Sequence, residues 1–282
     1  MNYAYLIDFL GDLSRNNNRE WFGANKERYN LSLDFYKQEV KRLIDKIAEF
    51  DSDIAYLKPE NCIFRIYRDI RFSPNKIPYK THFGAYIARN GGRKSPYAGY
   101  YLHIDAEQSF LSGGAYNPSR EVLSAIRHEI DVNYDELSDI VSDSHFRKYF
   151  GKIEPYMPPL KKFPAGFSAT SPAGELLRYK DFIIEHPLDA KTICAADFTD
   201  YAARIFHAMK PCNDFFNSII ADYCWPLCLL VSVLRGFSFC DFSFCLLLDL
   251  SRDGLPRLLP DEDLRLLLSL SKRVRLSCPI TF

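Results

Sequence analysis

The spacing of hydrophobic positions predicts helices on both sides of a central region that has a different period. Apolar residues at helical spacing over residues 6–13 predict a short helix that ends in the polar run 14–18. A longer helix is predicted to start at Asn17, with Glu20 placed as a capping-box carboxylate, and to end at Phe50. We interpret its apolar stripe as a core face rather than a partner-binding surface. That stripe consists of Tyr29, Leu33, Tyr36, Val40, Leu43, Ile44 and Ile47.

The central region is made of short β-branched and aromatic runs separated by Pro, Gly and Asn, which is typical of an antiparallel meander. The predicted strands are 62–67, 83–88, 100–104 and 109–113, followed later by 179–187. Asn117 and Pro118 are predicted to open a helix, and closing helices are predicted over 198–209 and, after a restart at Pro211, up to residue 220. The pattern therefore predicts an α+β fold, with a single antiparallel sheet flanked by helices and a long N-terminal helix.

Residue usage changes abruptly near Cys224, because all 18 tyrosines precede it and the sequence that follows is rich in Leu, Ser and Cys. We predict one α+β domain over residues 1–222 and an atypical tail over 223–282. The tail is interpreted as a membrane anchor, a packed extension or a frameshifted read-through. Arg235 and Asp241 leave an apolar run too short for a spanning helix of roughly 18 residues. The block change in composition favours the third interpretation.

The beginning of the chain and its cysteines predict a cytoplasmic protein. No positive segment precedes the first apolar residues, and Asp8 and Asp12 interrupt them, so no secretory signal is expected. The eight cysteines are then expected to be free thiols. No Cys-x-x-Cys or His-x-His pair, P-loop or dinucleotide fingerprint occurs, so we predict no metal and no cofactor. No membrane association is expected, and the sequence leaves the oligomeric state open.

Charge is segregated within a chain that is neutral overall. Lys plus Arg and Asp plus Glu each total 36, yet residues 61–100 hold eight basic residues and a single acid, Asp69. The basic residues are Arg65, Arg68, Arg71, Lys76, Lys80, Arg89, Arg93 and Lys94. A local excess of this kind is typical of a site for an anionic partner, and arginine suits two-pronged recognition of phosphate or carboxylate.

We place the candidate binding site in the densest part of this segment, RIYRDIRFSPNKIPYKTHF, where residues 68–78 would form a loop at the end of a strand. The ligand-binding candidates there are Arg65, Arg68, Arg71, Lys76, Tyr79 and Lys80. Gly113 and Gly114 precede the expected helix start at Asn117 and could add backbone amides to the same anion pocket. A plain tight turn is the alternative for this glycine pair.

His82, His103 and Asp69 are the catalytic candidates. Histidine suits acid–base chemistry near neutral pH, and His82 follows the basic loop directly. By strand alternation, His103 shares a face with Tyr101 and Asp105. Asp69 could orient a neighbouring arginine. The alternative for each histidine is a hydrogen-bonded, half-buried structural role.

The basic segment resembles a known family. Its pattern R-x-x-R-D-x-R-F, followed by Asn-Lys and a Tyr, falls on Arg65, Arg68, Asp69, Arg71, Phe72, Asn75, Lys76 and Tyr79. With NNNREWFGANKERY and SGGAYNPSREVLSAIR, it is similar to the conserved hypothetical bacterial family of domain of unknown function 2461, over about residues 3–222. The resemblance implies a domain that ends near Asp222. The resemblance implies no particular activity.

Three functions fit these observations. The first is a protein, and in one version an enzyme, that binds an anionic small molecule such as a phosphorylated or carboxylated compound or a nucleotide. The second is a nucleic-acid-binding module whose aromatic residues stack on bases, and the third is a structural protein with internal ion pairs. The stacking residues would be Tyr67, Phe72, Tyr79, Tyr86, Tyr97, Tyr100 and Tyr101. We favour the first function, since the rest of the domain is acidic.

Overall fold

The computed structural model describes residues 1–71 and 75–234. The chain divides into two units, Met1–Leu230 and Val231–Phe282. Most of the predicted tail, residues 235–282, lies outside the described residues, so its interpretation stays a prediction. Within the part of the chain that is described, no helix combines the length and the apolar character needed to cross a bilayer.

The N-terminal region forms three helices, α1 (Tyr3–Arg15), α2 (Arg19–Ala24) and α3 (Lys26–Ala48). The prediction of one helix starting at Asn17 is wrong, because Asn18 caps α2 and the chain breaks again at Asn25. The side chain of Asn17 is used elsewhere, since it hydrogen-bonds to both the carbonyl and the amide of Tyr79. The apolar stripe predicted for the long helix does face the core on α3, with Leu33 only partly buried.

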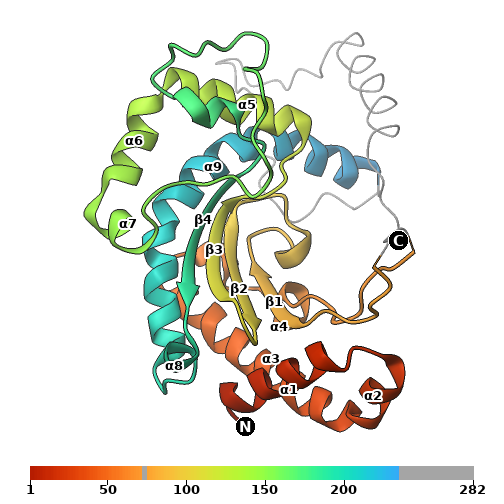
Figure 1. Cartoon of the computed structure of the whole chain (residues 1–282). Coiled ribbons are helices and arrows are strands. Elements are labelled where there is room, and N and C mark those ends of the chain that lie inside the picture. The colour runs from red at the N-terminus through yellow and green to blue at the C-terminus, as the bar shows by residue number, and fades with distance from the viewer. Residues whose placement is uncertain (72–74, 235–282) are drawn as a thin grey trace, which may run out of the picture. The chain divides into compact units, whose positions relative to one another are not determined.

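The sheet contains β1 (His82–Ile87), β2 (Gly99–Asp105), β3 (Ser109–Ala115) and β4 (Phe182–Leu188). The strands lie in this order and every neighbouring pair is antiparallel (Figure 1). This arrangement confirms the predicted α+β class with a single antiparallel sheet.

The predicted strand over residues 62–67 is wrong. Pro59–Cys62 forms the short helix α4, and the residues after it make only isolated bridges, Ile63 to Ala85 and Tyr67 to Tyr79. The segment folds back on itself, because the Lys80 amide donates to the carbonyl of Ile66 and the Arg68 amide donates to that of Pro78. The backbone groups of this segment therefore hydrogen-bond partly to β1 and partly within its own turn.

The remaining helices are α5 (Arg120–Val132), α6 (Tyr134–Ser142), α7 (Ser144–Tyr149), α8 (Ala190–Ile193) and α9 (Phe198–Leu234). Short 3-10 turns lie at Ser52–Ile54, Gly92–Lys94 and Gly174–Arg178. The predicted start of α5 at Asn117 is wrong, because Asn117 has a φ of +46° and the hydroxyl of Ser119 makes the cap. The predicted restart at Pro211 is also wrong: α9 runs through it, and apolar residues before and after it are buried.

The two faces of the sheet differ in burial. On the core face, Phe83 packs against Tyr36 of α3, and Tyr100 packs against Phe206 of α9, with ring centroids 5.2 and 5.3 Å apart. Asn213 of α9 joins this face to the strands through hydrogen bonds to Gly99 and Gly114. We call the opposite face the open face. It carries the half-buried side chains of His82, Tyr101, His103, Asp105 and Phe110.

Candidate functional site

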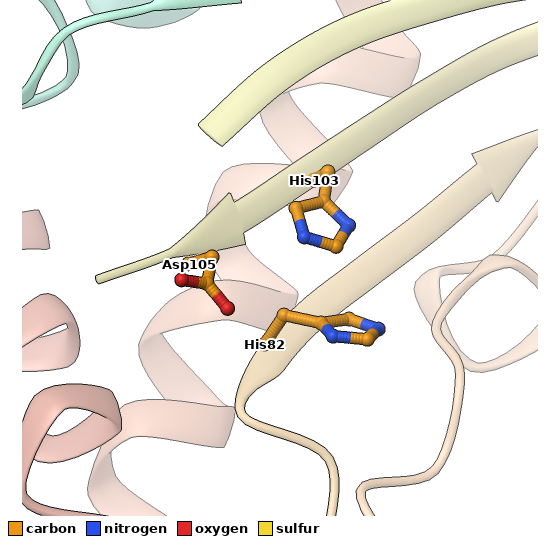
Figure 2. Close-up of side chains that lie close together, drawn as sticks. All are labelled: His82, His103 and Asp105. Atoms are coloured by element: carbon orange, nitrogen blue, oxygen red, sulfur yellow. The ribbon is translucent and has the colours of Figure 1, made fainter. Parts of the chain in front are cut away.

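His82, His103 and Asp105 come together on the open face, and we call them the His–His–Asp cluster. In the β1–β2 register His82 lies opposite Asp105, and alternation along β2 puts His103 on the same side as Asp105. One potential ligand atom from each residue lies within 4.8 Å of the others, and the two imidazole centroids are 4.2 Å apart. Figure 2 shows the three side chains directed into a common space from two neighbouring strands.

Alternation in the sequence placed His103, Tyr101 and Asp105 on one face, but it could not show that His82 joins them. That contact depends on the register between β1 and β2, which pairs His82 with Asp105. No local spacing carries this signal, because the residues of the cluster come from separate strands. Asp105 was therefore not among the predicted catalytic residues.

Neighbouring groups fix the orientation of the cluster. The Tyr101 hydroxyl lies 3.1 Å from Nδ1 of His103, and the ring of Phe110 stacks on the His103 imidazole at a centroid distance of 4.5 Å. Asp105 accepts hydrogen bonds from the Glu107 amide at 2.9 Å and from the Thr81 hydroxyl at 3.3 Å. Two of the three cluster residues are thus held by specific partners outside the cluster.

Gly84 makes room for the Tyr101 ring. Gly84 lies opposite His103 in the ladder, and a Cβ at this position would be 2.7 Å from the Tyr101 hydroxyl oxygen. Ring carbons of Tyr101 would also lie within 3.3 Å of that atom. The missing side chain lets the phenol lie across β1 and reach His103.

Burial disfavours the charged forms of the groups on this face. It lowers the pKa of His103 to about 4, with a further decrease from His82 and an opposing contribution from Asp105. The pKa of His82 is lowered by burial and then by Lys80, again opposed by Asp105. Burial, followed by the proximity of Arg65, also lowers the pKa of Lys80. The imidazole of His103 is therefore uncharged at neutral pH.

Aromatic side chains and one cation border the cluster. The ammonium of Lys80 lies 5.2 Å from the centroid of Phe64, whose ring meets Tyr101 edge-on at 6.3 Å. Tyr116 and Tyr156 pack edge to face at 5.7 Å and are 62% and 71% exposed. Both raise the pKa of Tyr101, which reaches about 12 mainly through burial.

Three more of the predicted anion-binding residues, Arg68, Arg71 and Lys76, lie in the loop that precedes β1. We call residues 68–76 the basic loop; its positions 72–74, including Phe72, lie outside the described residues. Within it, Asp69 forms a two-pronged ion pair with Arg71, with N–O distances of 3.0 and 2.7 Å. This pair lowers the pKa of Asp69 to about 2. Lys76 donates to the carbonyl of Ile70. Asp69, predicted to be catalytic, is thus engaged within the basic loop.

One predicted binding residue, Tyr79, and two other basic residues of the 61–100 segment, Arg89 and Arg93, have structural contacts. Tyr79 is buried and stacks on Phe22 at 3.9 Å, so its ring belongs to the core. Arg89 pairs with Asp53 and lies over the ring of Tyr97, outside the cluster. Arg93 donates to the carbonyls of Glu60 and Ile63. Arg65 and Arg68, in contrast, form no ion pair with any described residue.

Gly113 and Gly114 are neither part of a loop before Asn117, as the anion-pocket hypothesis requires, nor part of a tight turn. Both lie inside β3 and are buried. The amide of Gly114 donates to the side chain of Asn213 at 2.8 Å, so it is not free for an anion. A Cβ on Gly114 would lie 2.1 Å from the Phe182 carbonyl oxygen, which explains a glycine with a φ of +95° at this position. The glycines serve close packing between β3, β4 and α9.

The fold and the site define an α+β protein with a half-buried His–His–Asp cluster on the open face of an antiparallel sheet. The chain belongs to the family described as conserved hypothetical protein (DUF2461), whose model matches residues 5–215. The match covers the cluster and the basic loop, and it confirms the resemblance seen in the sequence. No curated protein and no solved structure matches the chain.

Proposed function

We propose that the protein binds an anionic small molecule, phosphorylated or carboxylated, on the open face of the sheet beside the His–His–Asp cluster. The observation that carries this proposal is the position of Lys80. Lys80 is half-buried, its ammonium lies 5.2 Å from the centroid of the Phe64 ring, and its charge lowers the pKa of His82. It forms no ion pair with the residues described. Because a partly desolvated cation without a counterion is unfavourable, an anion bound here would stabilise it.

Arg65 adds a second positive charge to the same region. It is exposed, and it lies close enough to Lys80 to lower the pKa of that side chain. A phosphate or carboxylate between the two cations would sit next to the cluster, whose imidazoles and carboxylate can act on it. Because the cluster would lie beside the bound anion, we propose in particular an enzyme that acts on it.

The other two functions have less support. Tyr79, Tyr97 and Tyr100 are buried, so these rings are not accessible for stacking on bases. The structural interpretation fits Arg89 and Arg93, which hold neighbouring backbone and side-chain groups in place. It does not account for Lys80, whereas Arg65 has an acidic neighbour in Asp69, whose pKa it helps to lower after Arg71.

The test compares two lysines of the same segment, Lys80→Met and Lys76→Met. Thermal shift and calorimetry would be run on the full chain with inorganic phosphate, nucleotides, sugar phosphates and small carboxylates. We expect one compound class to stabilise the wild type and Lys76→Met. In Lys80→Met its affinity should fall at least about 10-fold, because a charge-assisted hydrogen bond contributes roughly 1.5–3 kcal/mol.

Two outcomes would contradict the proposal. Equal losses in Lys80→Met and Lys76→Met would place the anion at the basic loop or at no defined site. Binding only to oligonucleotides, with an affinity that falls steeply as salt is raised, would identify a nucleic-acid-binding module instead. Arg65→Gln and Arg71→Gln form a second matched pair, in which only Arg65→Gln should lower the affinity for the anion.

A further inference from the structure

We propose that His82, His103 and Asp105 bind a single divalent transition-metal ion and leave at least one coordination position open toward solvent. This inference deepens the proposed function and rests on it for the location of the anion, which would bind next to the ion or through one of its oxygens on the ion itself. The argument begins with the chemistry of the three donors.

Two imidazoles and one carboxylate form a donor set that suits zinc, iron, copper or nickel rather than calcium or magnesium. Three protein ligands with an open position are typical of catalytic metal sites, whereas structural zinc sites use four. With bonds of about 2.0–2.2 Å to nitrogen and oxygen, the ligand atoms of a tetrahedral site lie roughly 3.4 Å apart. The three ligand atoms already lie within 4.8 Å of one another, so small side-chain rotations would close the site.

The backbone holds the three residues in this relation. His82 and Asp105 are direct partners in the β1–β2 ladder, and His103 pairs with Gly84 two positions further along. Sites carried on strands are positioned more accurately than sites carried on loops, because ladder hydrogen bonds fix the Cα atoms. The cluster faces the open side of the sheet, where its residues are only partly buried, so water or a substrate can reach it.

The neighbouring hydrogen bonds are those expected around a metal. Because Nδ1 of His103 is engaged by the Tyr101 hydroxyl, Nε2 is the nitrogen available for coordination. Asp105 is oriented by the Glu107 amide and the Thr81 hydroxyl. Among the residues that the structure describes, no other three His, Cys, Asp or Glu side chains gather in this way.

His186 shows what a structural histidine looks like in the same sheet. One ring nitrogen lies 2.9 Å from the Tyr149 carbonyl, and the other lies 2.7 Å from the Tyr201 hydroxyl. Both nitrogens are thus used within the fold. Within the described part of the chain, the ring of His103 hydrogen-bonds only to Tyr101, through Nδ1.

The test titrates the chelator-treated full chain with Co²⁺ and Zn²⁺ in the absence of any anion. Calorimetry gives the stoichiometry, and the visible spectrum of Co²⁺ reports the ligand types. We expect one ion per chain with nitrogen and oxygen ligands. His82→Gln, His103→Gln and Asp105→Asn should each weaken metal binding by at least about 100-fold, since loss of a group that only hydrogen-bonds to a ligand already costs about 10–100-fold.

Matched controls keep the result interpretable. His128→Gln and His145→Gln change exposed histidines on α5 and α7 and should bind metal like the wild type. Circular dichroism and the Tm of each variant show that it folds. Equal loss in the controls, the absence of a 1:1 site, or a cobalt spectrum dominated by sulfur ligands would overturn the inference.

The two proposals can fail separately. Metal titration contains no anion, and phosphate titration of the metal-free protein depends on Lys80. If metal binding is absent while phosphate binding still requires Lys80, only the metal site is wrong. If the metal binds and no anion does, only the proposed ligand is wrong.

Discussion

The open face of the sheet and the basic loop both carry charged residues that stand out in the sequence, but their surroundings differ. On the open face, ladder pairing fixes His82 opposite Asp105, and burial shifts the pKa values of both histidines. In the basic loop, Asp69 and Arg71 form an exposed ion pair between residues two positions apart. Local charge density therefore identified the neighbourhood, whereas strand register assembled the groups that can do chemistry.

The sharpest test of this difference compares two carboxylates, one from each region. Asp105→Asn should weaken Co²⁺ or Zn²⁺ binding by at least about 100-fold, because it removes the anionic ligand of the cluster. Asp69→Asn removes a carboxylate that Arg71 already engages, so metal affinity should not change. Calorimetry on the two variants measures both effects. Comparable losses of affinity would show that the basic loop contributes to the metal site.

A second test separates the anchoring of the loop from the cluster. Asn17 uses its side chain to hold both the amide and the carbonyl of Tyr79, at 3.1 and 3.0 Å. Asn17→Ala leaves these backbone groups without their partner and should reduce the free energy of unfolding by about 1–3 kcal/mol. Metal affinity should stay at the wild-type value, since Asn17 does not contact the cluster.

Urea unfolding and metal titration of the same samples check this expectation. Asn75→Ala is the matched control, because the side-chain oxygen of Asn75 accepts a hydrogen bond from the amide of Ile77 in an exposed turn. If Asn17→Ala lost metal affinity as well as stability, the anchoring of the loop would be coupled to the cluster, and the two regions would not be independent.

The third test asks whether Gly84 serves the cluster through Tyr101. Gly84→Ala would place a methyl group 2.7 Å from the Tyr101 hydroxyl oxygen and force the phenol away from His103. We expect metal affinity to fall about 10-fold, the low end of the range for loss of a group that hydrogen-bonds to a metal ligand. Tyr101→Phe should give a similar loss.

The double variant Gly84→Ala/Tyr101→Phe tests the mechanism. If the glycine acts only through the Tyr101 hydroxyl, the double variant should lose no more affinity than either single variant. Additive losses measured by calorimetry would mean that Gly84→Ala disturbs β1 itself. The Tm of all three variants separates a local displacement of one ring from damage to the sheet.

Most of the fold could be predicted from periodicity, because burial alternates where the sequence alternates. Leu102 and Ile104 are buried while His103 and Asp105 are half-exposed, as the pattern YYLHID indicates. Errors occurred where side chains serve distant partners. Asn17 bonds to Tyr79 instead of capping a helix, and the 62–67 segment turns back on itself instead of joining the sheet as a regular strand.

The site was predicted only in part for a related reason. Both histidines and the shared face of His103 and Asp105 follow from residue type and alternation. The meeting of His82 with Asp105 depends on a register that no local pattern encodes. The basic loop was predicted as a site because its charged residues are close together in the sequence. The same closeness allows Asp69 and Arg71 to form an ion pair with each other.

The smallest effect is expected for the stability of Asp69→Asn. Arg71 lowers the pKa of Asp69 to about 2 from an ordinary value of 3.8. A lowered carboxyl pKa means that the ion pair stabilises the folded state above pH 3.8, and that this contribution disappears as the pH falls to about 2. Both partners are exposed, however, so solvent and salt screen the pair strongly. Urea midpoints of the wild type and Asp69→Asn should therefore differ by no more than repeat measurements at pH 7, and should coincide at pH 2. A clear loss of stability at pH 7 that disappears in acid would show that the ion pair fixes the basic loop in the fold. The loop would then contribute to the stability of the fold, as the strands that carry the cluster do.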